Sequence, residues 1–215
     1  MNFYPTLENY ISKLSEGSKK VSDERKQILF DLAQGISTDL QTQKKSSLTF
    51  ICTHNSRRSH FAHIWAATLA AFFRIEQVQC YSGGTEATAL HQNTVAALRR
   101  AGFRINLSSD EQEYNPKYLI SYSDECKPEQ CYSKVYNEAP NPSTAFRAVM
   151  TCSEADENCP IVYGASARHS LTYEDPKISD NTVKETLTYD QRCLQIATEL
   201  WIVMRQLSEQ HSSDK

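Results

Sequence analysis

Apolar and polar positions follow two alternating patterns from residue 48 onward. Four apolar runs predict buried strands: LTFIC, VQCYS, FRAVMTC and the shorter HSLTY. Three segments show helical spacing of apolar residues: 58–73, NTVAALRRAG ending at Gly102, and 184–207. Strands that alternate with helices predict an α/β fold with a mainly parallel sheet.

Two segments lie outside this alternation. Residues 1–46 show helical spacing, and Ser22 is a candidate cap for their second helix. We expect them to form a helical extension that packs on a main domain of residues 47–215. Residues 107–145 are rich in Tyr, Ser, Asn and Pro, and we expect an insertion there, part loop and part hairpin built from YLISYS and CYSKVY.

Composition and charge narrow the class of protein. A net charge of −3 gives no indication of a nucleic-acid or membrane partner. The first twenty residues lack the basic start and apolar stretch of a secretory signal, so we expect a cytoplasmic protein. Seven cysteines, an odd number, in a reducing compartment argue against a static disulfide framework.

The cysteines outside the strand ends are expected to be structural. Cys80 and Cys193 sit in apolar-periodic contexts and are predicted to be buried. Cys126 and Cys131 lie in a polar stretch, where a metal pair is the weaker reading because no second pair of ligands lies nearby in the sequence. We therefore expect incidental thiols there, and no metal or cofactor.

The segment CTHNSRRS follows the first predicted strand and opens a helix. In a parallel α/β sheet, ligands bind beyond the carboxyl ends of the strands, and the following helix offers free N–H groups. A loop over residues 53–59 would then cradle a tetrahedral oxyanion, with Arg58 as a bidentate fork. The same field stabilises a thiolate on Cys52, and Ser59 could donate to its sulfur. The alternative is a chance cysteine before a basic helix start.

Two further thiols and an acid complete the candidate chemistry. Cys152 ends another apolar strand, and Cys159 follows after a polar, acidic segment that looks mobile enough for thiol–disulfide exchange. The alternatives are incidental cysteines or half a zinc site. Asp175, held extended by the following proline, could protonate a leaving oxygen, although Asp-Pro turns are common and Glu174 is a rival acid.

Together these residues resemble the low-molecular-weight protein tyrosine phosphatase superfamily, and within it the thioredoxin-coupled arsenate reductases. The segments that show this resemblance are CTHNSRRS, YSGGTEATALHQNTVAALRRAGF, MTCSEADENCPI and YEDP. The resemblance implies a flavodoxin-like four-stranded sheet flanked by helices, with Cys52 as nucleophile, Arg58 as oxyanion ligand and Asp175 as general acid. CSEADENCP resembles the segment that carries two resolving cysteines. The loop residues implied to bind or support the oxyanion are Thr53, His54, Asn55, Ser56, Arg57 and Ser59.

The chain departs from the family pattern at three positions. His54 replaces a usual glycine, and histidine tolerates left-handed backbone better than most residues. Arg57 stands where many members carry a second cysteine. His63 replaces a glutamate that the reductases tie to a potassium site, so we expect no such site.

Three functions remain open. The first is arsenate reduction through a Cys52, Cys152 and Cys159 relay that thioredoxin regenerates. The second is hydrolysis of phosphate monoesters through a phosphocysteine on Cys52, with the other thiols protecting it from oxidation. The third is a non-catalytic module that binds an anion or senses oxidants, which a complete set of Cys, Arg and Asp disfavours.

Overall fold

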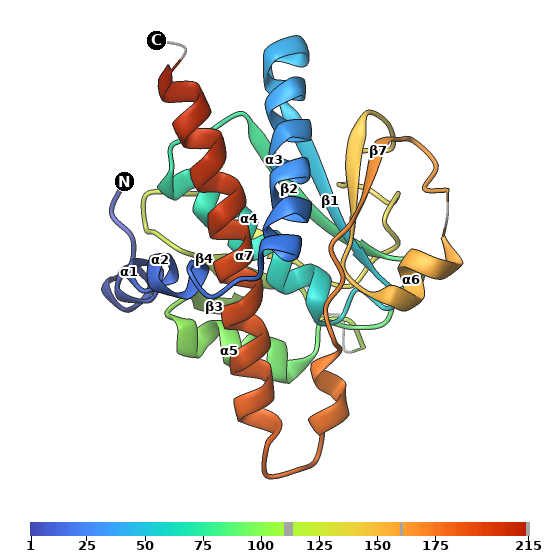
Figure 1. Cartoon of the computed structure of the whole chain (residues 1–215). Coiled ribbons are helices and arrows are strands. Elements are labelled where there is room, and N and C mark those ends of the chain that lie inside the picture. The colour runs from blue at the N-terminus through green and yellow to red at the C-terminus, as the bar shows by residue number, and fades with distance from the viewer. Residues whose placement is uncertain (110–113, 160, 214–215) are drawn as a thin grey trace.

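A computed structural model describes residues 1–109, 114–159 and 161–213. Its centre is a parallel sheet of four strands in the order β2-β1-β6-β7 (Figure 1). The strands are β1 (Ser46–Cys52), β2 (Val78–Gly84), β6 (Phe146–Met150) and β7 (Ala165–Ser170). β1 and β6 are buried along their whole length, as central strands covered on both faces must be. The predicted α/β fold with a mainly parallel sheet is confirmed.

Alternate residues of the central strands feed two separate cores. Leu48 and Phe50 of β1 point into the larger core, which the helices of one face fill. Ile51 points to the other face, into a smaller core that includes Met150 of β6. Cys52, the last residue of β1, also contacts this smaller core, so the nucleophile predicted from the sequence ends the strand beside it.

Helices cover the large core. The long helices are α3 (Asp23–Gln43), α4 (Arg58–Phe72) and α7 (Glu185–Ser213), and α7 packs across α3, α4 and α5 (Gln92–Ala101) (Figure 1). α5 ends at Gly102, which adopts the left-handed conformation of a helix C-cap, as predicted. Across the described residues, no helix combines the length and apolar character that a bilayer crossing requires.

The N-terminal segment forms α1 (Pro5–Ser12), α2 (Leu14–Ser18) and α3, in agreement with the predicted helices. The Ser22 side chain accepts a hydrogen bond from the Arg25 backbone and caps α3, as expected. A buried bidentate ion pair joins Asp39 of α3 to Arg147 of β6, with hydrogen bonds of 2.6 and 2.7 Å, and holds α3 against the sheet.

The segment around the expected insertion builds a second, antiparallel sheet. Its strands are β3 (Arg104–Leu107), β4 (Tyr118–Ser121) and β5 (Glu129–Cys131). The hairpin prediction was right for β4, but of CYSKVY only Cys131 is in a strand. The rest runs beside β2, where Gly84 exchanges backbone hydrogen bonds with Lys134 and Tyr136. HSLTY was also misplaced, since β7 starts at Ala165 and ends at Ser170.

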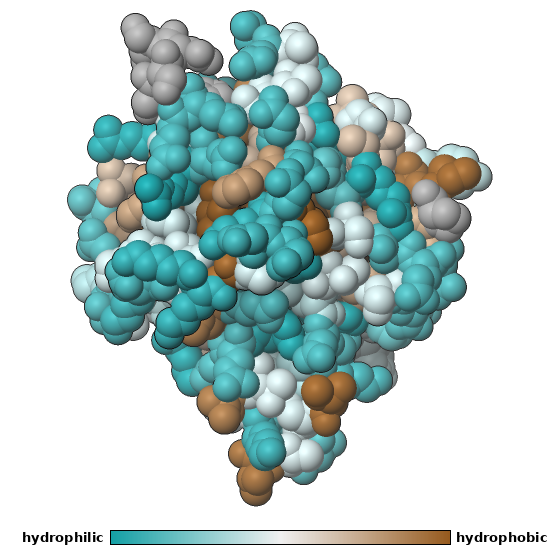
Figure 2. Space-filling model, viewed as in Figure 1, coloured by the Kyte–Doolittle hydropathy of each residue, from teal (hydrophilic) through white to brown (hydrophobic). Residues whose placement is uncertain are grey.

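The surface is mainly hydrophilic in the view of Figure 2. Apolar groups gather at the lower tip, where the 3₁₀ turn η1 (Pro176–Ser179) leads into α7 (Figures 1 and 2). The exposed apolar side chains here are Ile178 of η1, Val183 of the connection to α7 and Leu187 of α7. The turn η1 directly follows the candidate acid, Asp175.

Candidate active site

The loop between β1 and α4 turns its carbonyl oxygens away from its centre. The carbonyls of Cys52 and Thr53 accept from the amides of Thr85 and Glu86, at 3.1 and 3.0 Å. The carbonyl of His54 accepts from the Ser133 hydroxyl at 2.8 Å. Carbonyls that face outward leave the N–H groups of a tight loop facing inward, which is the geometry of an anion-binding nest.

Asn55 holds the loop in shape. Its φ of 44° is left-handed, a conformation that asparagine tolerates better than most residues. The Asn55 amide donates to Ser59 Oγ at 2.8 Å, and its oxygen accepts from the Lys134 amide at 3.0 Å. His54 was the residue expected to tolerate left-handed backbone, and the loop places that conformation one residue later.

Ser59 Oγ lies 3.1 Å from Cys52 Sγ. Because Ser59 already accepts a hydrogen bond from Asn55, its own proton is free to point at the sulfur. Cys52 is buried, yet its side chain lines a small pocket with His54, Ser56, Arg57, Arg58 and Asp175. The sulfur therefore sits at the base of a polar hollow, with a hydroxyl donor behind it.

Arg58 and Asp175 meet above this hollow. Arg58 Nη2 donates to Asp175 Oδ2 at 2.5 Å, and Nη1 donates to the Tyr173 carbonyl at 3.0 Å. Arg58 Nε is buried and has no hydrogen-bond partner among the described residues. A buried guanidinium N–H without a partner is costly, and an oxyanion in the pocket would satisfy it.

The structure separates the two candidate acids. Asp175 caps η1, its Oδ1 accepting from the Lys177 amide at 3.0 Å, and lines the pocket. The Glu174 side chain is 81% exposed and pairs with Arg192 at 3.2 Å. The geometry favours Asp175 over Glu174 as the group that can reach a bound oxyanion.

Arg57 belongs to a network that sequence reasoning missed. Its Nε donates to the Tyr189 hydroxyl at 2.6 Å and its Nη2 to Asp180 at 3.0 Å. Tyr189 stacks on His91, whose backbone amide donates to the Ser56 carbonyl. Burial, aided by the nearby Arg57 charge, lowers the pKa of His91. Arg57 therefore braces one wall of the pocket against α7.

Cys152 lies beside the loop. It caps helix α6 (Ser153–Asn158), its sulfur accepting from the Ala155 amide at 3.3 Å. Thr53 Oγ1 lies 3.5 Å from that sulfur and donates to the Glu154 carboxylate at 3.1 Å. Cys152 is fully buried in the same small core as Cys52.

Cys159 follows α6 directly and is half-buried against that core. The segment between Cys152 and Cys159, for which the sequence predicted no helix, forms a short helix with Cys152 as its N-cap. All three cysteines are free thiols. The predicted set of Cys52, Cys152 and Cys159 thus borders one apolar cluster at the carboxyl edge of β1 and β6.

The chain is similar in sequence to arsenate reductases and in fold to a phosphatase. No family model matches the chain. The arsenate reductase 2 of Staphylococcus haemolyticus is 27% identical over 132 residues, which are 61% of this chain and 79% of that protein. The arsenate reductase of Bacillus licheniformis is 28% identical over 148 residues, 69% and 86% of the two chains. A low-molecular-weight phosphotyrosine phosphatase from Vibrio cholerae O395 shares the fold, with a TM-score of 0.51 at 14% identity over 77% of this chain and 98% of that one.

Proposed function

We propose that the chain is an arsenate reductase of the low-molecular-weight protein tyrosine phosphatase superfamily, acting through Cys52, Cys152 and Cys159, a proposal that its likeness to arsenate reductases supports. The observation that carries the proposal is the gathering of these three free thiols around one small core. A hydrolase needs only Cys52, whereas a two-electron reduction needs a second thiol beside the first.

Arsenate binding is supported by the chemistry of the loop. Arsenate is a tetrahedral oxyanion, and the inward-facing N–H groups of residues 53–58 suit its oxygens. The Arg58 fork would exchange its contact with Asp175 for the anion and satisfy its unpaired Nε. That exchange frees the Asp175 carboxyl to act on a leaving oxygen.

The first step is nucleophilic. The Cys52 thiolate attacks arsenic, and one As–O bond breaks while Asp175 supplies the proton with which that oxygen departs as water. A covalent thiol–arsenate adduct remains on Cys52, with arsenic still in the +5 state. Ser59 stabilises the attacking thiolate by its hydrogen bond to the sulfur.

The second step is reductive. The Cys152 thiolate attacks Cys52 Sγ, the S–As bond breaks, and its electron pair stays on arsenic, which leaves as arsenite in the +3 state. Cys159 then attacks Cys152, frees Cys52 as a thiolate and forms a Cys152–Cys159 disulfide. Thioredoxin, a dithiol reductant of low potential, is the proposed source of the two electrons that reopen this disulfide.

A pair of assays tests this function. Arsenate reduction with thioredoxin, thioredoxin reductase and NADPH is compared with aryl phosphate hydrolysis in the wild type, Cys152→Ser and Cys159→Ser. We expect both variants to lose arsenate turnover and keep hydrolysis. The matched control is Cys193→Ser, which removes a buried thiol of the larger core that accepts a hydrogen bond from Trp65. Full arsenate turnover in both relay variants would contradict the proposal.

The second candidate function is hydrolysis of a phosphate monoester. It is favoured by the complete set of Cys52, Arg58 and Asp175, which requires no other thiol. Cys52 would form a phosphocysteine, and Asp175 would first donate a proton and then activate water. Brisk hydrolysis beside undetectable arsenate turnover in the wild type would favour this candidate.

A further inference from the structure

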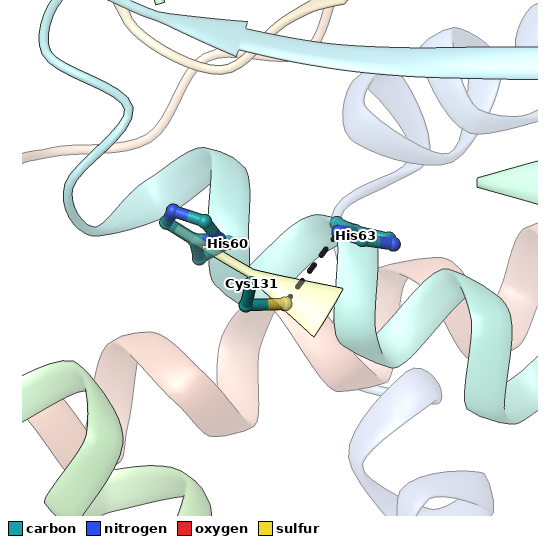
Figure 3. A group of neighbouring side chains, drawn as sticks. All are labelled: His60, His63 and Cys131. Atoms are coloured by element: carbon teal, nitrogen blue, oxygen red, sulfur yellow. Dashed lines mark hydrogen bonds between the residues drawn. The ribbon is translucent and has the colours of Figure 1, made fainter. Parts of the chain in front are cut away.

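A cluster of metal-ligating side chains includes Cys131 of the larger core, whereas the three thiols of the proposed relay border the smaller core. His60 and His63 of α4 and Cys131 of β5 bring three ligand atoms within 4.8 Å of one another (Figure 3). His60 and Cys131 are fully buried, and His63 is 3% exposed. Neither the proposed reduction nor the phosphatase chemistry uses any of these three residues.

His60 presents an unsatisfied nitrogen. Its Nδ1 lies 3.3 Å from Ser82 Oγ, whereas its Nε2 is buried without a hydrogen-bond partner among the described residues. In the tautomer in which Nδ1 donates to Ser82, Nε2 carries the lone pair with which a neutral imidazole binds a metal ion.

His63 is oriented by a carboxylate on its far side. Its Nε2 lies 3.3 Å from Glu129 Oε2, and its Nδ1 lies 3.9 Å from Cys131 Sγ (Figure 3). A carboxylate that accepts from one ring nitrogen leaves the other free to bind a metal ion, and metal-bound histidines commonly have such a carboxylate partner. Glu129 thereby fixes the ring with Nδ1 facing the thiol.

The number and type of ligands select the ion. With metal–nitrogen and metal–sulfur bonds of about 2.0 and 2.3 Å, the 3.9 Å between His63 Nδ1 and Cys131 Sγ corresponds to an angle of about 130° at the metal, near trigonal. Zn²⁺ in structural sites takes four ligands, and within the described residues the group holds three. Soft thiolate and imidazole ligands suit Cu⁺.

We propose that His60, His63 and Cys131 form a buried three-coordinate site for Cu⁺. On binding, the Cys131 S–H bond breaks, its proton leaves to solvent, and a Cu–S bond forms without change of oxidation state. The ion would join α4 to the antiparallel sheet. Since Lys134, three residues after Cys131, supports Asn55 through its backbone amide, the ion would also stiffen the oxyanion loop.

The test removes competing thiols from the full-length chain. Cys52, Cys126, Cys152 and Cys159 are changed to Ser, and the protein is titrated without oxygen against Cu⁺ held by a chromogenic chelator. We expect one equivalent of Cu⁺ to transfer to the protein, with an X-ray absorption signature of one sulfur and two nitrogens. Thermal unfolding should shift to higher temperature with bound Cu⁺.

Two variants in that background decide the outcome. Cys131→Ser should lose the bound equivalent, whereas Cys193→Ser, which removes an equally buried thiol, should retain it. Binding that survives Cys131→Ser, no transfer to a folded protein, or tighter binding of Zn²⁺ than Cu⁺ would overturn the proposal. If the four-fold variant does not fold, the wild type and Cys131→Ser are compared directly, and the proposal requires a difference of one equivalent.

Discussion

Two neighbouring strands of this sheet each lead into a cysteine and a helix, yet the two ends are built differently. After β1, Asn55, Ser59 and Arg58 are each fixed by two hydrogen bonds to side chains or backbone. After β6, Cys152 is held by an amide-to-sulfur bond at 3.3 Å, a weak Thr53 contact and apolar packing. Sulfur is a weak acceptor. The β1 end is suited to holding an anion, and the β6 end is suited to releasing its thiol.

The largest expected effect comes from the β1 end. Cys52→Ser should lower both arsenate reduction and aryl phosphate hydrolysis by at least about 10³-fold, because both reactions begin at this sulfur. Steady-state kinetics on the same preparation measure both rates. Both activities surviving intact would remove both enzymatic readings, since Cys52 is the one thiol that lines this pocket among the described residues.

The next effect separates two adjacent acids. Asp175→Asn should lower kcat by about 10²–10³-fold in both reactions, because proton transfer to the leaving oxygen is lost. Glu174→Gln should stay near wild type, since that side chain faces solvent. Equal losses in the two variants would show that the turn, and not the acid, is what the substitutions damage.

The β6 end should give a smaller and selective effect. Thr53 donates to Glu154 and lies next to Cys152, so Glu154 offers an acceptor for the proton of that thiol through Thr53. Glu154→Gln should slow arsenate reduction by about 3–10-fold while leaving hydrolysis within about 2-fold. Glu157→Gln, a neighbouring exposed acid on α6, is the matched control. An equal loss of phosphate hydrolysis would show that Glu154 acts on the bound oxyanion. It would contradict the claim that the loop after β1 holds the anion while the segment after β6 serves only the thiol relay.

The smallest effect is a pH dependence confined to the β1 end. Because the folded state lowers the pKa of His91, His91 adds stability that is present above its ordinary pKa and lost as pH falls through the lowered value. Protonation also sets its charge against Arg57. Acidification from pH 7 to 5 should lower the Tm less in His91→Gln than in the wild type, by about 1–3 °C. Hydrogen exchange should quicken in the loop before α4, where the Ser56 carbonyl accepts from the His91 amide, and an unchanged difference in Tm would contradict this role.

Local sequence patterns were sufficient to predict the central strands and the sheet edge that carries Cys52 and Cys152. The apolar runs of β1 and β6 predict central strands because both faces of those strands are buried. Strand ends in a parallel sheet share an edge, so Cys52 and Cys152 could be placed together from the sequence.

Contacts that depend on long-range packing left no local signal. Tyr189 reaches Arg57 across 132 residues, and Cys131 meets His63 across 68. Cys131 was weighed as a metal ligand only beside Cys126, because sequence spacing cannot reveal which helix the antiparallel sheet packs against. The short helix α6 was missed because a cysteine is not among the usual N-caps.

The proposed relay between Cys52 and Cys152 is tested most directly by trapping its intermediate. Cys159→Ser is mixed with one equivalent of arsenate in the absence of reductant, quenched by acid and alkylation, and digested for mass spectrometry. We predict one arsenite released per chain and a Cys52–Cys152 disulfide in matching amount, because no third thiol resolves it. Arsenite release without that disulfide, or a disulfide joining Cys52 to any other cysteine, would contradict the account.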